Sequence, residues 1–176
     1  AMIASSRSLG SSILVAIEQI MPNTWLLASV LPSSRSEIGT AAVIDFAGNA
    51  LTRFDQGIQL AANASRAYMT LPERDILKGA DPSKVVLVTE LEIEGAPGPS
   101  SATKSRNLLY FKKTKDLQLP KPEIKLAVAA GVNGALAVSV GAKQLARNVF
   151  LASGAVDGFF DDNYFDGLPG ETVTVP

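Results

Sequence analysis

Three glutamates at alternate positions are the residues of this sequence whose type and spacing come closest to a catalytic set. Glu90, Glu92 and Glu94 lie in the run 85–94. Two carboxylates hydrolyse a glycosidic bond when they stand about 5–9 Å apart across a cleft that holds the sugar. Here the alternation predicts a half-buried strand, whose carboxylates form a solvated face instead of a catalytic pair. The opposite, apolar face of that strand would consist of Val85, Leu87, Leu91 and Ile93.

A second pattern, Ser101 with Lys104, has the Ser-x-x-Lys spacing of penicillin-binding enzymes. That chemistry requires a helix that begins at the serine, together with Ser-Asp-Asn and Lys-Thr-Gly motifs. The sequence lacks both motifs, and a Pro-Gly-Pro loop precedes the serine. We therefore interpret the match as a coincidence.

A third pattern is a group of aspartates near the C-terminus. Calcium requires six or more oxygens that converge on one point, and its common loop has acidic residues at alternate positions with a central glycine. The spacing here does not fit that loop, and Asp and Asn favour turns without any metal. The sequence thus favours an acidic turn, formed by Asp157, Asp161, Asp162 and Asp166.

Composition excludes several classes of function. The sequence has no histidine and no cysteine, which excludes Ser-His-Asp and Cys-His catalysis, histidine-ligated zinc and disulfides. The 16 basic and 17 acidic residues give a net charge of −1, which offers no electrostatic reason to bind nucleic acid or an anionic membrane. No apolar run reaches the roughly 18 residues of a membrane-spanning helix. We expect no metal, no cofactor, no nucleic acid and no membrane as partner.

Aromatic side chains could provide a flat surface on which sugar rings stack. Trp25 alternates with Leu27 and Ser29 and could equally lie in a core, as one tryptophan of an immunoglobulin-type sandwich commonly does. Tyr164 precedes an expected strand and fits a tyrosine corner, in which the hydroxyl bonds to upstream backbone. The sequence leaves the carbohydrate-binding residues unknown. The candidates considered are Trp25, Tyr68, Tyr110 and Tyr164.

Short strands between turn signals dominate the first part of the chain. Their regular spacing predicts a β-sandwich over residues 11–111. One helical turn is expected at residues 73–78, directly after Pro72, and no longer helix elsewhere. The strand candidates are 13–20, 24–31, 39–46, 51–60, 64–71, 85–94 and 107–111.

A second unit is expected over residues 124–176. The Lys-rich segment 112–123 contains Pro120 and Pro122, which favour an extended linker. Asn133 and Gly134 between two apolar runs predict a hairpin of strands 124–130 and 135–140. Further strands are expected at 145–152 and 171–175, on either side of a turn region at 156–170. The 53 residues of this unit fall short of the roughly 100 of an immunoglobulin sandwich. We therefore predict an all-β chain of two immunoglobulin-like domains, the second incomplete.

Particular segments resemble the β-mannosidases of glycoside hydrolase family two. The junction of their last two domains is similar to residues 105–111 (SRNLLYF) and 115–123 (KDLQLPKPE). Their terminal immunoglobulin-like domain is similar to 146–151 (ARNVFL), 162–166 (DNYFD) and 168–171 (LPGE), although Gly167 replaces a larger apolar residue. Residues 39–71 are similar in pattern to the preceding sandwich. The structural motif carried by the resemblance consists of Asp162, Asn163, Tyr164, Phe165, Pro169 and Gly170.

The resemblance implies a parent hydrolase that removes terminal β-D-mannose from oligosaccharides with a (β/α)₈ barrel. This chain shows no alternating strand–helix pattern, so it would contribute no catalytic residue and would pack against that barrel. The chain alone would not be an enzyme, whereas its parent would be one. Oligosaccharide is a possible second partner, and a periplasmic or extracellular location is favoured. The alternatives are the tail of an exo-β-glucosaminidase or endo-β-mannosidase, or a free-standing carbohydrate-binding or adhesive module. The reading frame upstream of Ala1 would discriminate them.

Overall fold

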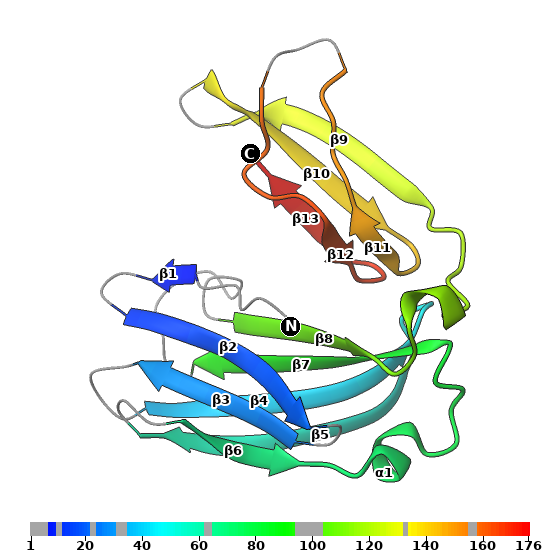
Figure 1. The fold of residues 1–176 in the computed structure, drawn as a ribbon. Coiled ribbons are helices and arrows are strands. Elements are labelled where there is room, and N and C mark those ends of the chain that lie inside the picture. Colours follow the sequence, from blue (N-terminus) through cyan, green and yellow to red (C-terminus); the bar gives the residue numbers. More distant parts are fainter. Residues whose placement is uncertain are drawn as a thin grey trace. The chain divides into compact units, whose positions relative to one another are not determined.

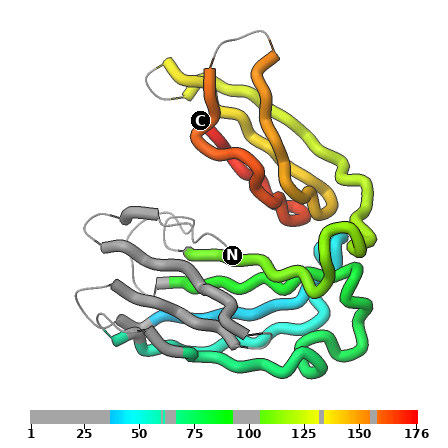
Figure 2. Tube along the Cα trace, in the orientation of Figure 1, coloured from blue at the N-terminus to red at the C-terminus, as the bar shows by residue number. Residues whose placement is uncertain are grey.

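A computed structural model describes residues 7–9, 12–21, 24–30, 35–61, 65–93, 104–131, 134–154 and 158–176. Its side chains are described within 37–59, 67–92, 105–131, 134–154 and 158–176, and at residue 61. The chain forms two compact units, shown in Figure 1 and Figure 2. The first comprises Ala1–Ile44 and Ala50–Lys115, and the second comprises Asp45–Asn49 and Asp116–Pro176. Strands are the main regular elements of each unit, as the sequence predicts.

The first unit contains two four-stranded sheets. One has the order β1-β2-β3-β6 and the other the order β5-β4-β7-β8. All seven predicted strands form, and an unpredicted short strand, β1, pairs antiparallel with β2. The sequence does not signal β1 because three residues in a serine-rich segment are too few for an alternating pattern. The strands are β1 (Arg7–Leu9), β2 (Ser12–Met21), β3 (Thr24–Val30), β4 (Arg35–Asp45), β5 (Ala50–Leu60), β6 (Ser65–Thr70), β7 (Val85–Ile93) and β8 (Lys104–Tyr110).

The core of the first unit lies between the sheets and one short helix. Val43 of β4 and Leu87 of β7 are fully buried. Met69 of β6 and Leu71, which directly follows this strand, pack against the same cluster. The predicted single helical turn is confirmed as α1 (Glu73–Leu77), which buries its last two residues in this cluster. The helix ends at Lys78, whose φ of 47° is left-handed. No helix in the described part of the chain is long and apolar enough to cross a membrane.

Strand β7 departs from the predicted alternation. Val85, Leu87 and Leu91 of its apolar face are buried as expected, whereas the side chain of Ile93 lies outside the described residues. Val86 and Val88 on the other face are also buried. Both faces are therefore covered along the first five residues of β7, and Glu90 and Glu92 are only partly exposed instead of forming the predicted solvated face. The alternation could not reveal this, because cover on the second face comes from residues distant in sequence.

The second unit has a three-stranded and a two-stranded sheet. In the first, β9 (Ile124–Ala130) and β13 (Thr172–Val175) flank β10 (Leu136–Ala142). In the second, β11 (Ala146–Val149) pairs with β12 (Phe165–Gly167). The predicted hairpin is confirmed, because β9 and β10 pair antiparallel with Ala130 opposite Leu136. Gly134 has the positive φ that the turn requires, while Asn133 lies outside the described residues.

Two expectations for this unit were wrong in detail. Strand β11 is shorter than the predicted 145–152, and β12 forms inside the segment expected to be only a turn. The core consists of apolar side chains from both sheets and from the segment after β11. Its buried members are Val140, Ala142, Ala146, Val149, Leu151 and Val175. The segment 112–123 includes a 3₁₀ turn at Thr114–Asp116.

Candidate functional site

Asn163 links the segment before β12 to the segment after β11, just beyond the point where the pairing of these two strands ends. Its side-chain Oδ1 accepts a hydrogen bond from the Leu151 backbone N–H at 2.6 Å, and its Nδ2 donates to the Leu151 carbonyl at 2.9 Å. A carboxamide offers one acceptor and donors in the same plane, so it pairs with a residue's backbone as a neighbouring strand would. Leu151 lies two residues beyond the end of β11 and is buried. The side chain therefore satisfies both backbone groups of a core residue.

Asp166 of β12 makes a second link, to the backbone of β11. Its Oδ1 accepts a hydrogen bond from the backbone N–H of Asn148 at 2.8 Å, where the register of the β11–β12 pair is irregular. Asn148 has a φ of 51°, a left-handed conformation that asparagine tolerates better than most residues. At this irregularity, Asp166 thus provides the acceptor for the backbone N–H of Asn148.

The structure does not support the predicted tyrosine corner at Tyr164. The side chain is 67% exposed, and its ring lies against Phe150 with a centroid distance of 5.0 Å and an interplanar angle of 30°. Phe150 is itself exposed. Tyr164 has a φ of 60°, and its backbone N–H donates to Asn163 Oδ1. The two rings form an exposed aromatic pair.

The segment 168–171 forms a tight turn that joins β12 to β13. Gly170 has a φ of 77°, its N–H donates to the Ala142 carbonyl, and Glu171 N–H donates to the Leu168 carbonyl. Pro169 precedes the glycine and is half-buried. Only glycine adopts this φ without a steric cost, so the Pro-Gly pair fixes the direction in which β13 begins.

The aspartates of this region act as acceptors for backbone N–H groups. Asp162 Oδ1 accepts from the Asn163 N–H at 2.9 Å, and Asp166 binds Asn148 as described. Asp157 lies outside the described residues. Within the described ranges, no group of three or more Asp, Glu, His or Cys residues is arranged to hold a metal ion.

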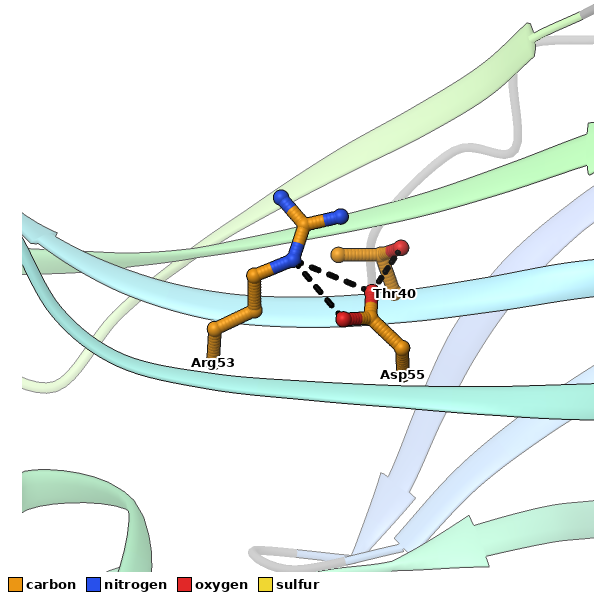
Figure 3. Close-up of polar contacts among 3 residues, drawn as sticks. All are labelled: Thr40, Arg53 and Asp55. Carbon is orange, nitrogen blue, oxygen red and sulfur yellow. Dashed lines mark hydrogen bonds and ion pairs between the residues drawn. The ribbon is translucent and has the colours of Figure 1, made fainter.

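A polar group that the sequence did not single out lies on β4 and β5 (Figure 3). Asp55 accepts hydrogen bonds from Arg53 Nε at 2.9 Å and from the Thr40 hydroxyl at 2.7 Å. Thr40 and Asp55 are directly opposite in the register, on the face away from the core. The hydrogen bond from Arg53, followed by that from Thr40, lowers the pKa of Asp55 below its ordinary value. The signal in the sequence that could have indicated this pair is the alternate spacing of Arg53 and Asp55, which puts both side chains on one face of a strand.

Glu90 forms a second carboxylate–arginine pair on the same sheet. Its Oε1 accepts from Arg106 Nη2 at 2.6 Å and from Arg106 Nε at 2.8 Å, across the β7–β8 pair. The Glu90 side chain is only 22% exposed, so the predicted freely solvated glutamate face was wrong at this position. Opposite charges on neighbouring strands stabilise a sheet, so this pair has a structural role.

The remaining candidates from the sequence are not brought together. Tyr68 and Tyr110 are half-buried in β6 and β8. Ser101, Glu94 and the side chains of Lys104 and Trp25 lie outside the described residues. The candidate features of the described surface are thus the hydrogen-bonded Asp55–Arg53 and Glu90–Arg106 pairs and the Phe150–Tyr164 aromatic pair.

The two units correspond to immunoglobulin-like β-domains, and comparison with protein families identifies their type. Residues 39–116 match the mannosidase Ig/CBM-like domain, and residues 119–176 match the Ig-fold domain named for mannosidases. The chain therefore belongs to the mannosidase-associated Ig-like domains, as the sequence resemblance implied.

Solved structures of glycoside hydrolases share this fold. The β-D-mannosidase of Dictyoglomus thermophilum is 16% identical with a TM-score of 0.66, and the match covers 98% of this chain and 19% of that one. The exo-chitosanase CsxA of Amycolatopsis orientalis, in complex with PNP-β-D-glucosamine, is 17% identical with a TM-score of 0.55, over 90% of this chain and 22% of that one. This chain thus spans about a fifth of the length of these proteins. No curated protein matched the chain.

Proposed function

We propose that this chain is the non-catalytic C-terminal β-sandwich region of a β-mannosidase-like glycoside hydrolase. The observation that carries the proposal is that both mannosidase-type Ig domains occur here one after the other, over residues 39–116 and 119–176. The parent would remove terminal β-D-mannose from oligosaccharides, and this region would pack against its (β/α)₈ barrel. The proposed division is a sandwich at 11–111, a linker at 112–123 and an Ig-like domain at 124–176.

The described carboxylates support a structural role. Asp55 and Glu90 are each held by an arginine, and Asp162 and Asp166 accept from backbone N–H groups. Retaining hydrolysis requires two carboxyl groups about 5–5.5 Å apart around a bound sugar, one of them protonated. The proposed task of the 162–170 motif is accordingly to hold β11, β12 and β13 together.

Aryl β-D-mannoside hydrolysis tests this function. The purified chain should release no nitrophenol, whereas the complete parent should release it, and removal of residues 1–176 from the parent should lower its thermal stability. Turnover by the isolated chain that survives repurification, and is lost on replacing one carboxylate, would contradict the structural role. Preference of the parent for aryl β-D-glucosaminide would instead favour the exo-β-glucosaminidase alternative, to which the exo-chitosanase similarity also points.

The exposed Phe150–Tyr164 pair favours a second candidate, a carbohydrate-binding module. Aromatic faces that reach solvent are where sugar rings stack in such modules, and tyrosine adds a hydroxyl. Titration with mannose, followed by NMR, would show shifts of both rings if the pair binds sugar. Loss of those shifts in Tyr164→Ala, with the fold intact, would promote this candidate over the architectural one.

A further inference from the structure

Five residues of the second unit come from the first half of the sequence. The turn Asp45–Asn49, which connects β4 to β5, belongs to the same compact unit as Asp116–Pro176, and the residues on either side of it belong to the first unit. The family matches place this turn in the mannosidase Ig/CBM-like domain at 39–116, apart from the Ig-fold domain at 119–176. The structure therefore groups the 45–49 turn differently from the family domains.

Two contacts hold the 45–49 turn within the second unit. The backbone N–H of Leu145, the residue before β11, donates to the Phe46 carbonyl at 2.9 Å, and both residues are buried. Gly48 lies against Pro169, because a Cβ added at Gly48 would be only 2.9 Å from Pro169 Cβ, closer than real side chains approach. The turn thus meets both the start of β11 and the turn that leads into β13.

Asp45 fixes the shape of the turn before it docks. Its Oδ1 accepts from the backbone N–H groups of Ala47 at 2.9 Å and Asn49 at 2.8 Å. Its Oδ2 accepts from Asn49 Nδ2 at 2.8 Å, and its backbone carbonyl accepts from the Gly48 N–H at 3.0 Å. A segment that is already ordered loses little conformational freedom when it binds. The turn is therefore preorganised for its place in the second unit.

We propose that the 45–49 turn is a structural element of the Ig-fold domain at 119–176, which depends on it for its stability. Leu145 is buried, so withdrawal of the Phe46 carbonyl would leave a backbone N–H without its acceptor. A buried donor that has lost its acceptor costs free energy, because water does not replace the bond. The domain that the family match delimits is accordingly not autonomous.

The dependence links the second unit to the β4–β5 pair. The turn is covalently continuous with these strands, and Ile44 lies opposite Ala50 at its base. Loss of this pairing would release the ends of the turn and withdraw it from the second unit. Unfolding of β4 and β5 should therefore destabilise the second unit as well. This proposal concerns folding and does not depend on the activity of the parent.

Amide hydrogen exchange in the 176-residue chain tests the proposal. Gly48→Ala places a methyl group against Pro169 and should raise the exchange rate of the Leu145 amide at least about tenfold, with a smaller rise at Val140 of β10. Gly79→Ala is the matched control from the first unit. Gly79 has a similar φ of 87°, against 96° at Gly48, but no described atom lies within 4 Å of its added Cβ. The control should leave the Leu145 exchange rate within about twofold of the natural value.

Asp45→Ala is a second variant that keeps the proposal testable if Gly48→Ala fails to fold. It removes the acceptor of three hydrogen bonds inside the turn and should raise the Leu145 exchange rate at least about threefold. An exchange rate within about twofold of the natural value in both variants would overturn the proposal, because the second unit would then be stable without the ordered turn. Equal acceleration in Gly79→Ala would also overturn it, since strain elsewhere in the first unit would then have the same effect.

Discussion

Replacing Asn163 with alanine is expected to destabilise the second unit by about 2 kcal/mol. The change removes two hydrogen bonds, 2.6 and 2.9 Å long, to the backbone of Leu151. Leu151 is buried, so water replaces these bonds incompletely, and each contributes roughly 1 kcal/mol net. For a unit of roughly 60 residues, about 2 kcal/mol corresponds to a fall in Tm of roughly 8–16 °C.

Circular dichroism during heating and amide hydrogen exchange measure this effect. The Leu151 amide should exchange faster in Asn163→Ala, since its acceptor is gone. Asp161→Ala is the matched control, because its exposed carboxylate lies in the same turn and should change stability by less than about 0.5 kcal/mol. An unchanged exchange rate at Leu151, with a stability within about 0.5 kcal/mol of the natural chain, would refute the reasoning.

Leu87→Ala should lower the free energy of unfolding in urea by about 2–5 kcal/mol, because Leu87 is fully buried. Leu136→Ala should lower it by less than about 0.5 kcal/mol, because Leu136 is 57% exposed. The hydrogen bond from Arg53 lowers the pKa of Asp55 below its ordinary value of 3.8. The pair therefore stabilises the fold fully above that ordinary value, and this contribution is lost as the pH falls through the lowered pKa. Arg53→Met should raise the pKa of Asp55 in an NMR titration and make stability less sensitive to acid below that pH; an unshifted pKa would count against the pair. Gly170→Ala should cost about 1–2 kcal/mol by calorimetry because its φ is 77°, and a neutral result would show that the turn relaxes.

The hairpin of β9 and β10 and the single turn of α1 were predictable because local sequence encodes them. A glycine at positive φ between alternating apolar runs defines the hairpin, and Pro72 starts the helix that Lys78 ends. These signals lie within a few residues of the elements that they specify. The same holds for the all-β class, since strand spacing and turn residues are properties of short windows.

The sequence also identified the 162–170 segment, but not what its residues do. Asn163 and Leu151 are twelve residues apart, and nothing local indicates that a carboxamide pairs with that backbone. Tyr164 was expected to be tied to upstream backbone, yet its φ is left-handed and its exposed ring lies against Phe150. Neither the left-handed φ of Tyr164 nor its contact with Phe150, fourteen residues earlier, is indicated by the local sequence.

By itself, the sequence determined the class of fold, the strand candidates and the absence of histidine and cysteine chemistry. Tertiary structure alone decided which faces are covered, so that Val86 on the expected outer face of β7 is buried while Leu126 of β9 is exposed. An alternating strand exposes two faces with a period of two, and its own residues specify only which side chains share a face. Whether a face meets a second sheet depends on segments distant in sequence, and that cover sets the burial of each side chain.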